Sequence, residues 1–383
     1  MKYNFDEIID RRNTGSLKWD VKENELPMWV ADMDFKTAPE IIEALEERVS
    51  HGVFGYGIIP DEWYDSYINW WKARHNFTLE KEWLIFCTGA VPAISSIVRK
   101  LTTPNENVVI ETPVYNIFFN SIINNGARVL ENRLIYRDHK YEIDFEDLEE
   151  KLSNPQTSLM ILCNPHNPIG KIWEEEELKR IGDLAAKYHV TVISDEVHCD
   201  ITEPSFSYTP FASVSENCRM NSITCIAPSK CFNLAGMQTA AVSVPDPYLR
   251  HKVWRGLNTD EVAEPNAFAV PVTVAAFTKG EDWLNEFNEY IAGNRKLVSE
   301  FISENIKDAV LIEGHATYLL WIDMTAYQKE NEDLAEYIRA KTGLYLASGE
   351  EYGESGKNFI RMNVACPRAT LKKGLELLKE ALL

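Results

Sequence analysis

The sequence predicts an α/β protein with a mostly parallel central sheet in a large domain, and a smaller α+β domain built from the N- and C-terminal segments. Two observations support this prediction. Between residues 84 and 245, short apolar segments alternate with segments of helical spacing, as in parallel sheets covered on both faces. From about residue 286 onward, long helical patterns alternate with short strand patterns. We therefore expect a large domain over residues 51–285 and a small domain over residues 1–50 and 286–383.

The strands predicted for the large domain are short and almost entirely apolar. In chain order they span residues 84–87, 108–110, 159–163, 190–193, 223–226 and 240–244. Helical spacing follows at residues 93–101 and 178–185. In sheets of this kind, ligands bind at the carboxyl ends of the strands. Polar residues directly after these strands are therefore candidates for a functional site.

The two ends of the chain carry different patterns. Thr37-Ala-Pro-Glu40 resembles a capping box and predicts the start of a helix with Ile41 and Leu45 on its apolar face. Towards the C-terminus, residues 318–322 and 358–362 predict short strands between long helices. These segments are the expected elements of the small domain.

Composition argues against several classes of protein. The chain has 59 acidic residues against 39 Lys and Arg, and its net charge of −20 is unlike that of a nucleic-acid binder. No apolar run approaches the roughly 18 residues that span a membrane, and the N-terminus lacks the pattern of a signal peptide. The seven cysteines form no Cys-x-x-Cys pair, so we expect free thiols and a cytoplasmic location. Cys163 with His166, and His198 with Cys199, lack a second matching pair, so no metal site is expected.

Polar clusters follow the predicted strands. Gly89-Ala-Val91 opens a helix, where backbone amides bind phosphate, although a plain strand-to-helix turn would look the same. Asp195 ends one strand, and Lys230 follows another at a depth that is unusual for an unpaired lysine. Together with the aromatic Tyr115, these parts suit a cofactor with a phosphate, a cationic ring nitrogen and an aldehyde. Pyridoxal phosphate has these three features.

The sequence resembles the fold-type I pyridoxal-phosphate enzymes of the class I and II aminotransferase superfamily. Within them it is most similar to the cystathionine β-lyase (C–S lyase) branch, of the MalY and PatB type. The resemblance covers nearly the whole chain, and the order and spacing of its motifs make it specific. The motifs are Pro27–Phe35, Gly52–Gly57, Leu162–Gly170, Ser194–Asp200, Ala227–Gly236 and Phe359–Pro367.

The resemblance implies a role for each candidate residue. Lys230 would bind the cofactor covalently and act as the acid–base on the substrate Cα, while Asp195 would pair with the ring nitrogen. Arg361 would grip the substrate carboxylate through its planar fork. The remaining implied cofactor-binding residues are Gly89, Ala90, Val91, Tyr115, Asn167, His198 and Ser229, and the remaining substrate-binding residues are Trp29 and Ala31.

Two positions depart from the ordinary aminotransferase pattern. His198 stands where that group usually has tyrosine, and Gln238 stands where it usually has a phosphate-binding arginine. Both departures match the C–S lyase branch. The resemblance also implies a homodimer with shared active sites, in which Tyr56 is a catalytic and cofactor-binding residue that reaches the phosphate of the neighbouring subunit.

The expected reaction is α,β-elimination of L-cystathionine, L-cysteine or related S-conjugates to a thiol, pyruvate and ammonia. An aminotransferase acting on an L-amino acid is the first alternative, because it shares every step up to loss of the Cα proton. A non-catalytic regulator with the same fold is the second alternative. Retention of Lys230, Asp195 and Arg361 favours an enzyme over the regulator.

Overall fold

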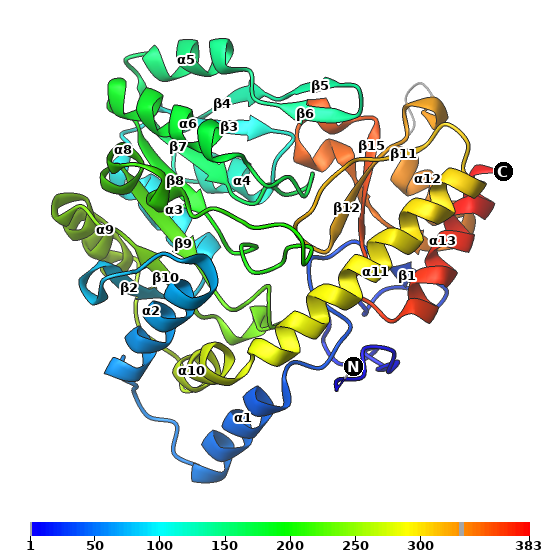
Figure 1. Cartoon of the computed structure of the whole chain (residues 1–383), viewed down its shortest axis with the longest axis horizontal. Helices are drawn as coiled ribbons and strands as arrows, with labels where there is room; N and C mark the ends of the chain where they lie inside the picture. The colour runs from blue at the N-terminus through cyan, green and yellow to red at the C-terminus, as the bar shows by residue number, and fades with distance from the viewer. Residues whose placement is uncertain (1, 329–332) are drawn as a thin grey trace.

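The protein is described by a computed structural model that covers residues 2–328 and 333–383. At its centre lies a seven-stranded sheet with the order β2-β10-β9-β8-β7-β3-β4 (Figure 1). Its strands are β2 (Leu84–Cys87), β3 (Asn107–Thr112), β4 (Arg128–Arg133), β7 (Thr157–Cys163), β8 (Thr191–Asp195), β9 (Ser222–Ile226) and β10 (Ala240–Ser243). Strands β4, β3, β7, β8 and β9 pair in parallel, whereas β10 is antiparallel to both of its neighbours. The predicted mostly parallel sheet is confirmed, and β4 is an edge strand that the sequence did not indicate.

Helices cover both faces of this sheet because its strands are apolar on both sides. Met160 and Leu162 of β7 pack on one face with Leu178 of α6, whereas Ile161 packs on the other face with Ile97 of α3. The helices of this part are α2 (Asp61–His75), α3 (Ala90–Leu101), α4 (Ile117–Ile123), α5 (Phe145–Ser153), α6 (Glu175–Lys187), α7 (Phe211–Val214), α8 (Glu216–Met220), α9 (Pro247–Thr259) and α10 (Ala269–Lys279). The helices predicted at residues 93–101 and 178–185 lie within α3 and α6.

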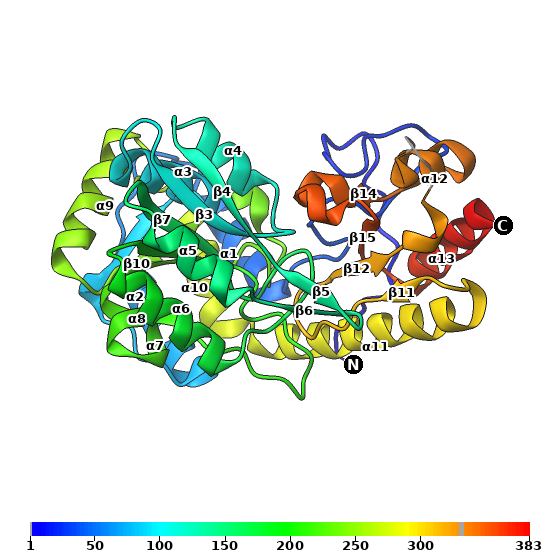
Figure 2. The same ribbon diagram turned by 90° about the horizontal axis from the view of Figure 1, so that it is seen from above.

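A smaller antiparallel sheet lies beside the large one, with the order β11-β12-β15-β14 (Figure 2). Its strands are β11 (Val310–Leu311), β12 (Leu319–Asp323), β14 (Ala347–Ser348) and β15 (Phe359–Asn363), and its helices are α11 (Glu281–Asn305), α12 (Leu334–Thr342) and α13 (Arg368–Leu382). Short pairs are formed by β1 (Leu26–Pro27) with β13 (Leu344–Tyr345), and by β5 (Ile135–Arg137) with β6 (Lys140–Glu142). The division at residues 50/51 and 285/286 stays a prediction.

Helix α1 (Pro39–His51) begins without the predicted capping box. The residue before it is Ala38, no side chain caps its first turn, and the buried hydroxyl of Thr37 has no hydrogen-bond partner among the described residues. The prediction was wrong because Pro39 starts the helix itself: its fixed φ suits the first helical position, where its missing N–H is not needed. Helix α1 packs against α10 and leads into the exposed residues 52–58.

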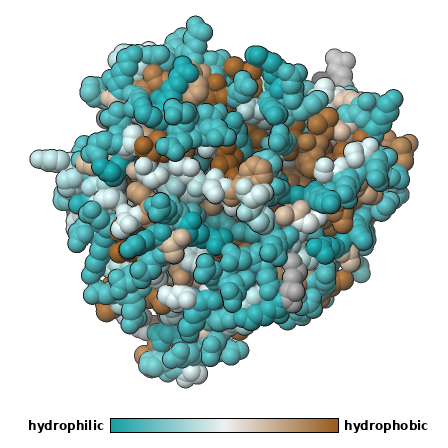
Figure 3. Space-filling view, viewed as in Figure 1, coloured by the Kyte–Doolittle hydropathy of each residue, from teal (hydrophilic) through white to brown (hydrophobic). Residues whose placement is uncertain are grey.

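The surface of the face in Figure 3 is mostly hydrophilic, and hydrophobic side chains gather over the small sheet where it meets the large one. Within the described residues, none of the helices combines the length and the apolar character that crossing a membrane requires. The turns that follow β7 and β9 lie close to β15: Asn167, after β7, accepts a hydrogen bond from Arg361 of β15, and the segment around Ala31 links Arg361 to Lys230, after β9. We call this junction of the two sheets, with Lys230, Asp195, Asn167 and Arg361, the hollow.

Candidate active site

Lys230 lies in the turn that follows β9. Its Nζ donates a 2.9 Å hydrogen bond to the carbonyl oxygen of Ala31, and the side chain is half-buried. Burial and the nearby guanidinium of Arg361 lower the Lys230 pKa to about 8, against the opposing influence of Asp195 and Asp32. A lysine with this pKa can hold or release a proton near neutral pH, as a general acid–base must.

Asp195 is the last residue of β8, and pairing places it level with Cys163 of β7 and Cys225 of β9. The carboxylate is buried and accepts a long 3.4 Å hydrogen bond from the backbone N–H of Val197. Burial raises the Asp195 pKa to about 7, although the Val197 N–H and Lys230 lower it. A buried carboxylate held this weakly is suited to a cationic partner.

The N-terminus of α3 lies beside this carboxylate. Ala90 packs with Val197 and Ala227, which belong to the Asp195 and Lys230 turns. The helix has no side-chain cap at Gly89 and no acidic residue in its first turn, so no side chain competes with an anion for the amides of that turn. Ser229 is adjacent to Lys230 in the chain and is half-buried. This corner of the site therefore suits a phosphate group.

Arg361 enters the site from the small sheet, where β15 holds it between β12 and β14. The side chain is 5% exposed; Nη1 donates to Asn167 Oδ1 at 3.1 Å and Nη2 donates to the Trp29 carbonyl at 2.8 Å. Its Nε is buried without a hydrogen-bond partner among the described residues. Part of the guanidinium fork thus remains available for a carboxylate. The bond from Arg361 occupies Asn167 Oδ1, so the amide NH₂ of Asn167 can serve a different partner.

Aromatic and imidazole rings complete the walls of the hollow. Burial raises the Tyr115 pKa to about 12, with a further rise from Asp195 and an opposing influence of Arg361, and the ring packs edge-on against Phe118. Burial, together with Lys230 and Arg361, holds the His198 pKa well below 6.5, so this ring is neutral. The Trp29 ring stacks on Tyr345 with centroids 4.7 Å apart, at the small-sheet side of the hollow.

Residues 28–33, which we call the strap, connect Lys230 with Arg361 through their backbone carbonyls. Ala31 O accepts from both Lys230 and the hydroxyl of Tyr318 at 2.9 Å. Asn363 donates to Val30 O at 2.5 Å and to Asp32 O at 2.6 Å. The sequence did not indicate that Asn363 binds the strap, because its side chain donates to backbone carbonyls, which any residue supplies. The available signal was its place two residues after Arg361 in a strand, which puts both side chains on one face.

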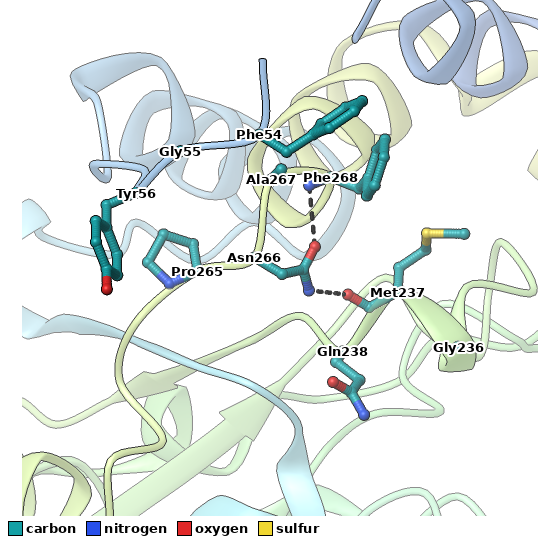
Figure 4. A pocket seen from close by; sticks show the side chains of 10 residues that line it. All are labelled: Phe54, Gly55, Tyr56, Gly236, Met237, Gln238, Pro265, Asn266, Ala267 and Phe268. Atoms are coloured by element: carbon teal, nitrogen blue, oxygen red, sulfur yellow. Dashed lines mark hydrogen bonds between the residues drawn. The ribbon is translucent and has the colours of Figure 1, made fainter. Parts of the chain in front are cut away.

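Tyr56 lies apart from this cluster. Its side chain is fully exposed and makes no hydrogen bond to the Lys230 cluster within the described residues. With Gln238 it lines a cavity of about 690 Å³, whose other walls are Phe54, Gly55, Gly236, Met237 and residues 265–268. Figure 4 shows Tyr56 and Gln238 on different sides of this cavity, with Asn266 bonded to the backbone of Met237 and Phe268. The structure therefore brings together the predicted site residues of the hollow but leaves Tyr56 on the surface.

A group of metal-ligand type lies outside the hollow. His75, Cys199 and Asp200 each place one ligand atom within 4.8 Å of the others. The Asp200 carboxylate already accepts from Trp70 Nε1 at 3.1 Å, and lies 3.0 Å from both His75 Nε2 and Arg74 Nε. Because Arg74 supplies the compensating positive charge, we interpret this cluster as a structural ion pair.

Comparison with known proteins identifies relatives that match nearly the whole chain. The sequence profile of the family "Aminotransferase class I and II" matches residues 24–378. Cystathionine beta-lyase PatB of Bacillus subtilis is 41% identical over 99% of this chain and 100% of its own length, and protein MalY of Escherichia coli is 29% identical over 97% of both.

Solved structures agree with the sequence relatives. Cystalysin from Treponema denticola, which contains a pyridoxal 5'-phosphate cofactor, matches with a TM-score of 0.96 and 32% identity, over 100% of this chain and 99% of its own. The pyridoxal-phosphate-bound C–S lyase from Staphylococcus hominis matches with a TM-score of 0.93 and 34% identity, over 100% of this chain and 98% of its own. These matches confirm the predicted fold class. The chain therefore belongs to the class I and II aminotransferase family of fold-type I enzymes and, within it, to the branch that contains PatB and the C–S lyases.

Proposed function

We propose that the protein is a pyridoxal-phosphate-dependent C–S β-lyase that converts L-cystathionine, L-cysteine or related S-conjugates into a thiol, pyruvate and ammonia. The observation that carries this proposal is the placement of three residues: Lys230 and Arg361 both donate to backbone carbonyls of residues 29–31, and Asp195 ends the strand beside β9, which Lys230 follows. The name of the PatB relative and the C–S lyase structure support the reaction type.

The residues present fit the cofactor. Asp195 is a buried anion without a strong hydrogen bond, and the first turn of α3 offers backbone amides without a side-chain cap. Pyridoxal phosphate, when bound, supplies a carbonyl carbon that links to amines and a cationic ring that accepts negative charge. Asp195 would hold the ring nitrogen, the amides of Ala90 and Val91 with Ser229 would hold the phosphate, and Lys230 would form the covalent link. Tyr115 would stack on the ring, while Asn167 and His198 would contact its edge.

The chain's own groups can perform the elimination in order. Arg361 binds the substrate carboxylate, with Trp29 and Ala31 lining the same side, and so fixes the direction of the Cα–H bond. Lys230, freed when the substrate amine takes its place in the covalent link, would then take the proton from Cα, and its lowered pKa of about 8 matches this task near neutral pH. The bond from Cβ to sulfur breaks, the sulfur leaves as thiolate, and a Cα–Cβ double bond forms. Hydrolysis of the unsaturated product yields pyruvate and ammonia.

The test separates elimination from transamination. Given cystathionine alone, the holoenzyme should form pyruvate and ammonia over many turnovers, because elimination returns the cofactor unchanged. An aminotransferase would stop after one half-reaction until a keto acid is added. Product should therefore be counted per enzyme site with and without a keto acid. Stalling that a keto acid relieves would replace the lyase proposal with the aminotransferase.

We also propose a homodimer with shared active sites and a cytoplasmic location. The exposed Tyr56 and the cavity it forms with Gln238 suit a neighbouring subunit, whose phosphate Tyr56 would reach. The seven cysteines are free and buried, which suits a reducing compartment. The expected ligands are small amino acids. The expectations of no nucleic-acid partner and no metal site stay predictions.

A further inference from the structure

The strap that holds Lys230 is itself fixed by a cluster of four charged residues from the N-terminal segment. Arg11 binds Asp32 through both of its terminal nitrogens, at 3.2 and 2.8 Å, and binds Asp34 at 2.7 Å. Lys18 binds Asp34 at 2.9 Å and lies 3.6 Å from Asp32 Oδ1. We call these residues, Arg11, Lys18, Asp32 and Asp34, the ion cluster. It contains two cations and two anions, so its formal net charge is zero.

The ion cluster is shielded from solvent to an unusual degree. Lys18 is 1% exposed and Asp34 is 4% exposed, and the side chains of Arg11 and Asp32 are about one-fifth exposed. Charges in such surroundings are weakly screened, so their influence reaches further than that of surface ion pairs. An exposed pair on the same segment, Lys36 with Glu7 at 2.7 Å, provides the natural contrast.

One peptide bond and one hydrogen bond connect the ion cluster to Lys230. Asp32 directly follows Ala31, whose carbonyl accepts the Lys230 hydrogen bond. Arg11 also donates to Met33 O at 2.9 Å, so the cluster grips both the side chains and the backbone of the strap. The charged groups that face Lys230 are Arg361 from β15, Asp195 from β8 and Asp32 from the strap. Two neutral titratable groups lie beside them: His198, and Tyr318, whose hydroxyl shares the Ala31 carbonyl with Lys230.

We propose that the ion cluster is a positioning device for Lys230, in which Arg11 and Lys18 cancel the charge of Asp32 and Asp34 and thereby set how readily Lys230 is protonated. The inference rests on the proposed function only in taking Lys230 as the amine that binds the cofactor. Arg11, Lys18, Asp32 and Asp34 contact neither substrate nor reacting atoms and act through the strap.

Two substitutions should shift the pH at which the Lys230 nitrogen is half-protonated, in opposite directions. Asp32→Asn leaves the cluster with a surplus positive charge, which disfavours protonation of the Lys230 nitrogen. Arg11→Gln leaves a surplus negative charge, which favours it. The readout is the midpoint pH of the absorbance change of the holoenzyme, which reports the proton on the cofactor-bound Lys230 nitrogen. We expect a shift of about 0.5–1 pH unit downward for Asp32→Asn and upward for Arg11→Gln.

The double variant separates charge from structure. Asp32→Asn with Arg11→Gln restores a neutral cluster, so the midpoint should return towards the wild-type value even if stability falls further. Lys36→Gln, on the exposed pair, should leave the midpoint unchanged. Lys18→Gln removes the other cation and should also shift the midpoint upward, which gives an independent test if Arg11→Gln does not fold.

The outcomes distinguish the inference from the proposed function. Opposite shifts that cancel in the double variant support the inference. Equal midpoints in all variants, or shifts in one direction for both single variants, overturn it while leaving the lyase proposal intact. If borohydride reduction and peptide mapping find no cofactor on Lys230 of the wild type, the proposed function fails first and the inference fails with it.

Discussion

The hollow around Lys230 and the exposed residues 52–58 both carry motifs of the same family, yet they are built in opposite ways. In the hollow, Asp195, Asn167 and Arg361 are at most 5% exposed, and neighbouring strands or the strap hold them. In residues 52–58, Tyr56 is fully exposed and Ile58 is 80% exposed. The comparison indicates that the chain buries the side chains of the hollow but leaves the apolar side chains of residues 52–58 exposed. Exposed apolar patches of this kind mark interaction sites.

The largest effect should come from removing the Lys230 amine, which tests whether the hollow is the reaction centre. Lys230→Ala should lower turnover with cystathionine by at least roughly 10³-fold, because the covalent anchor and the proton carrier are lost together. Pyruvate formation measures the loss. Borohydride reduction of the wild type, followed by peptide mapping, should place the cofactor on Lys230. Finding it on another lysine would remove the central assignment of the site.

The next largest effect should come from the guanidinium fork. Arg361→Lys keeps the charge but loses the planar geometry that binds a carboxylate through two nitrogens. We expect kcat/KM to fall by roughly 30- to 1000-fold, which corresponds to about 2–4 kcal/mol and lies within the cost of disrupting one partner of a buried charge pair. The matched control is Arg339→Lys, which alters a partly exposed arginine bonded to Glu25. Similar losses in both variants would mean that Arg361 acts through stability and does not bind substrate.

The interior region was the easier one to predict from sequence. The six strands that were predicted all occur, because continuous apolar runs such as Leu159–Cys163 can be buried on both faces only within a covered sheet. The polar residues at the ends of these strands were identified for the same reason, since Asp195 is the last residue of β8 and Lys230 lies in the turn after β9. Local spacing therefore predicted the large sheet and the chemistry at its edge.

What the sequence did not reveal depends on contacts between distant residues. The antiparallel direction of β10 follows from its pairing with both β9 and β2, which no local pattern records. The strap is held by Asn363, which is about 330 residues away from it in the chain. The capping box at Thr37 was wrong because proline at the first helical position replaced it. Patterns of residues along the chain do not encode side chains that bind a distant backbone.

The exposed region can be tested by combining two defective chains. Lys230→Ala and Tyr56→Ala proteins, each with low activity, should be mixed after partial unfolding and refolded together. If Tyr56 serves the neighbouring subunit, one site of each mixed dimer has both residues intact. With random pairing, about half of the dimers are mixed, so roughly a quarter of all sites should recover.

The same experiment has an outcome that would contradict a shared active site. If Tyr56 serves its own chain, each site with Lys230 still lacks its tyrosine, and mixing restores no activity. Refolding each variant alone provides the baseline, and size-exclusion chromatography of the products shows whether dimers have formed. Dimers without recovery would keep the interface and reject the role of Tyr56 at the partner's site.

The smallest expected effect is on the pH dependence of stability, through the buried carboxyl group of Glu111. Glu111 lies on β3 in the interior of the protein, and both of its carboxylate oxygens are buried without a hydrogen-bond partner among the described residues. Burial, with a contribution from Glu177 and against Lys171, raises the Glu111 pKa from 4.5 to about 8. The folded chain therefore keeps Glu111 protonated at pH values where the unfolded chain has released the proton.

The sign of the pH dependence follows from this raised pKa. The contribution of Glu111 to the free energy of unfolding is fully present below pH 4.5 and is lost as pH rises towards about 8. Glu111→Gln, which stays neutral, should match the wild type near the acidic end and become more stable than the wild type, by several degrees in Tm, towards pH 8. Thermal unfolding at a series of pH values measures this divergence. Glu47→Gln, on the exposed face of α1 before residues 52–58, should follow the wild type throughout. If the Tm difference between Glu111→Gln and the wild type were constant across the whole pH range, Glu111 would have the same pKa in the folded and unfolded chain and would be charged in the folded protein at neutral pH. The interior around Glu111 would then tolerate a charge as the exposed region does.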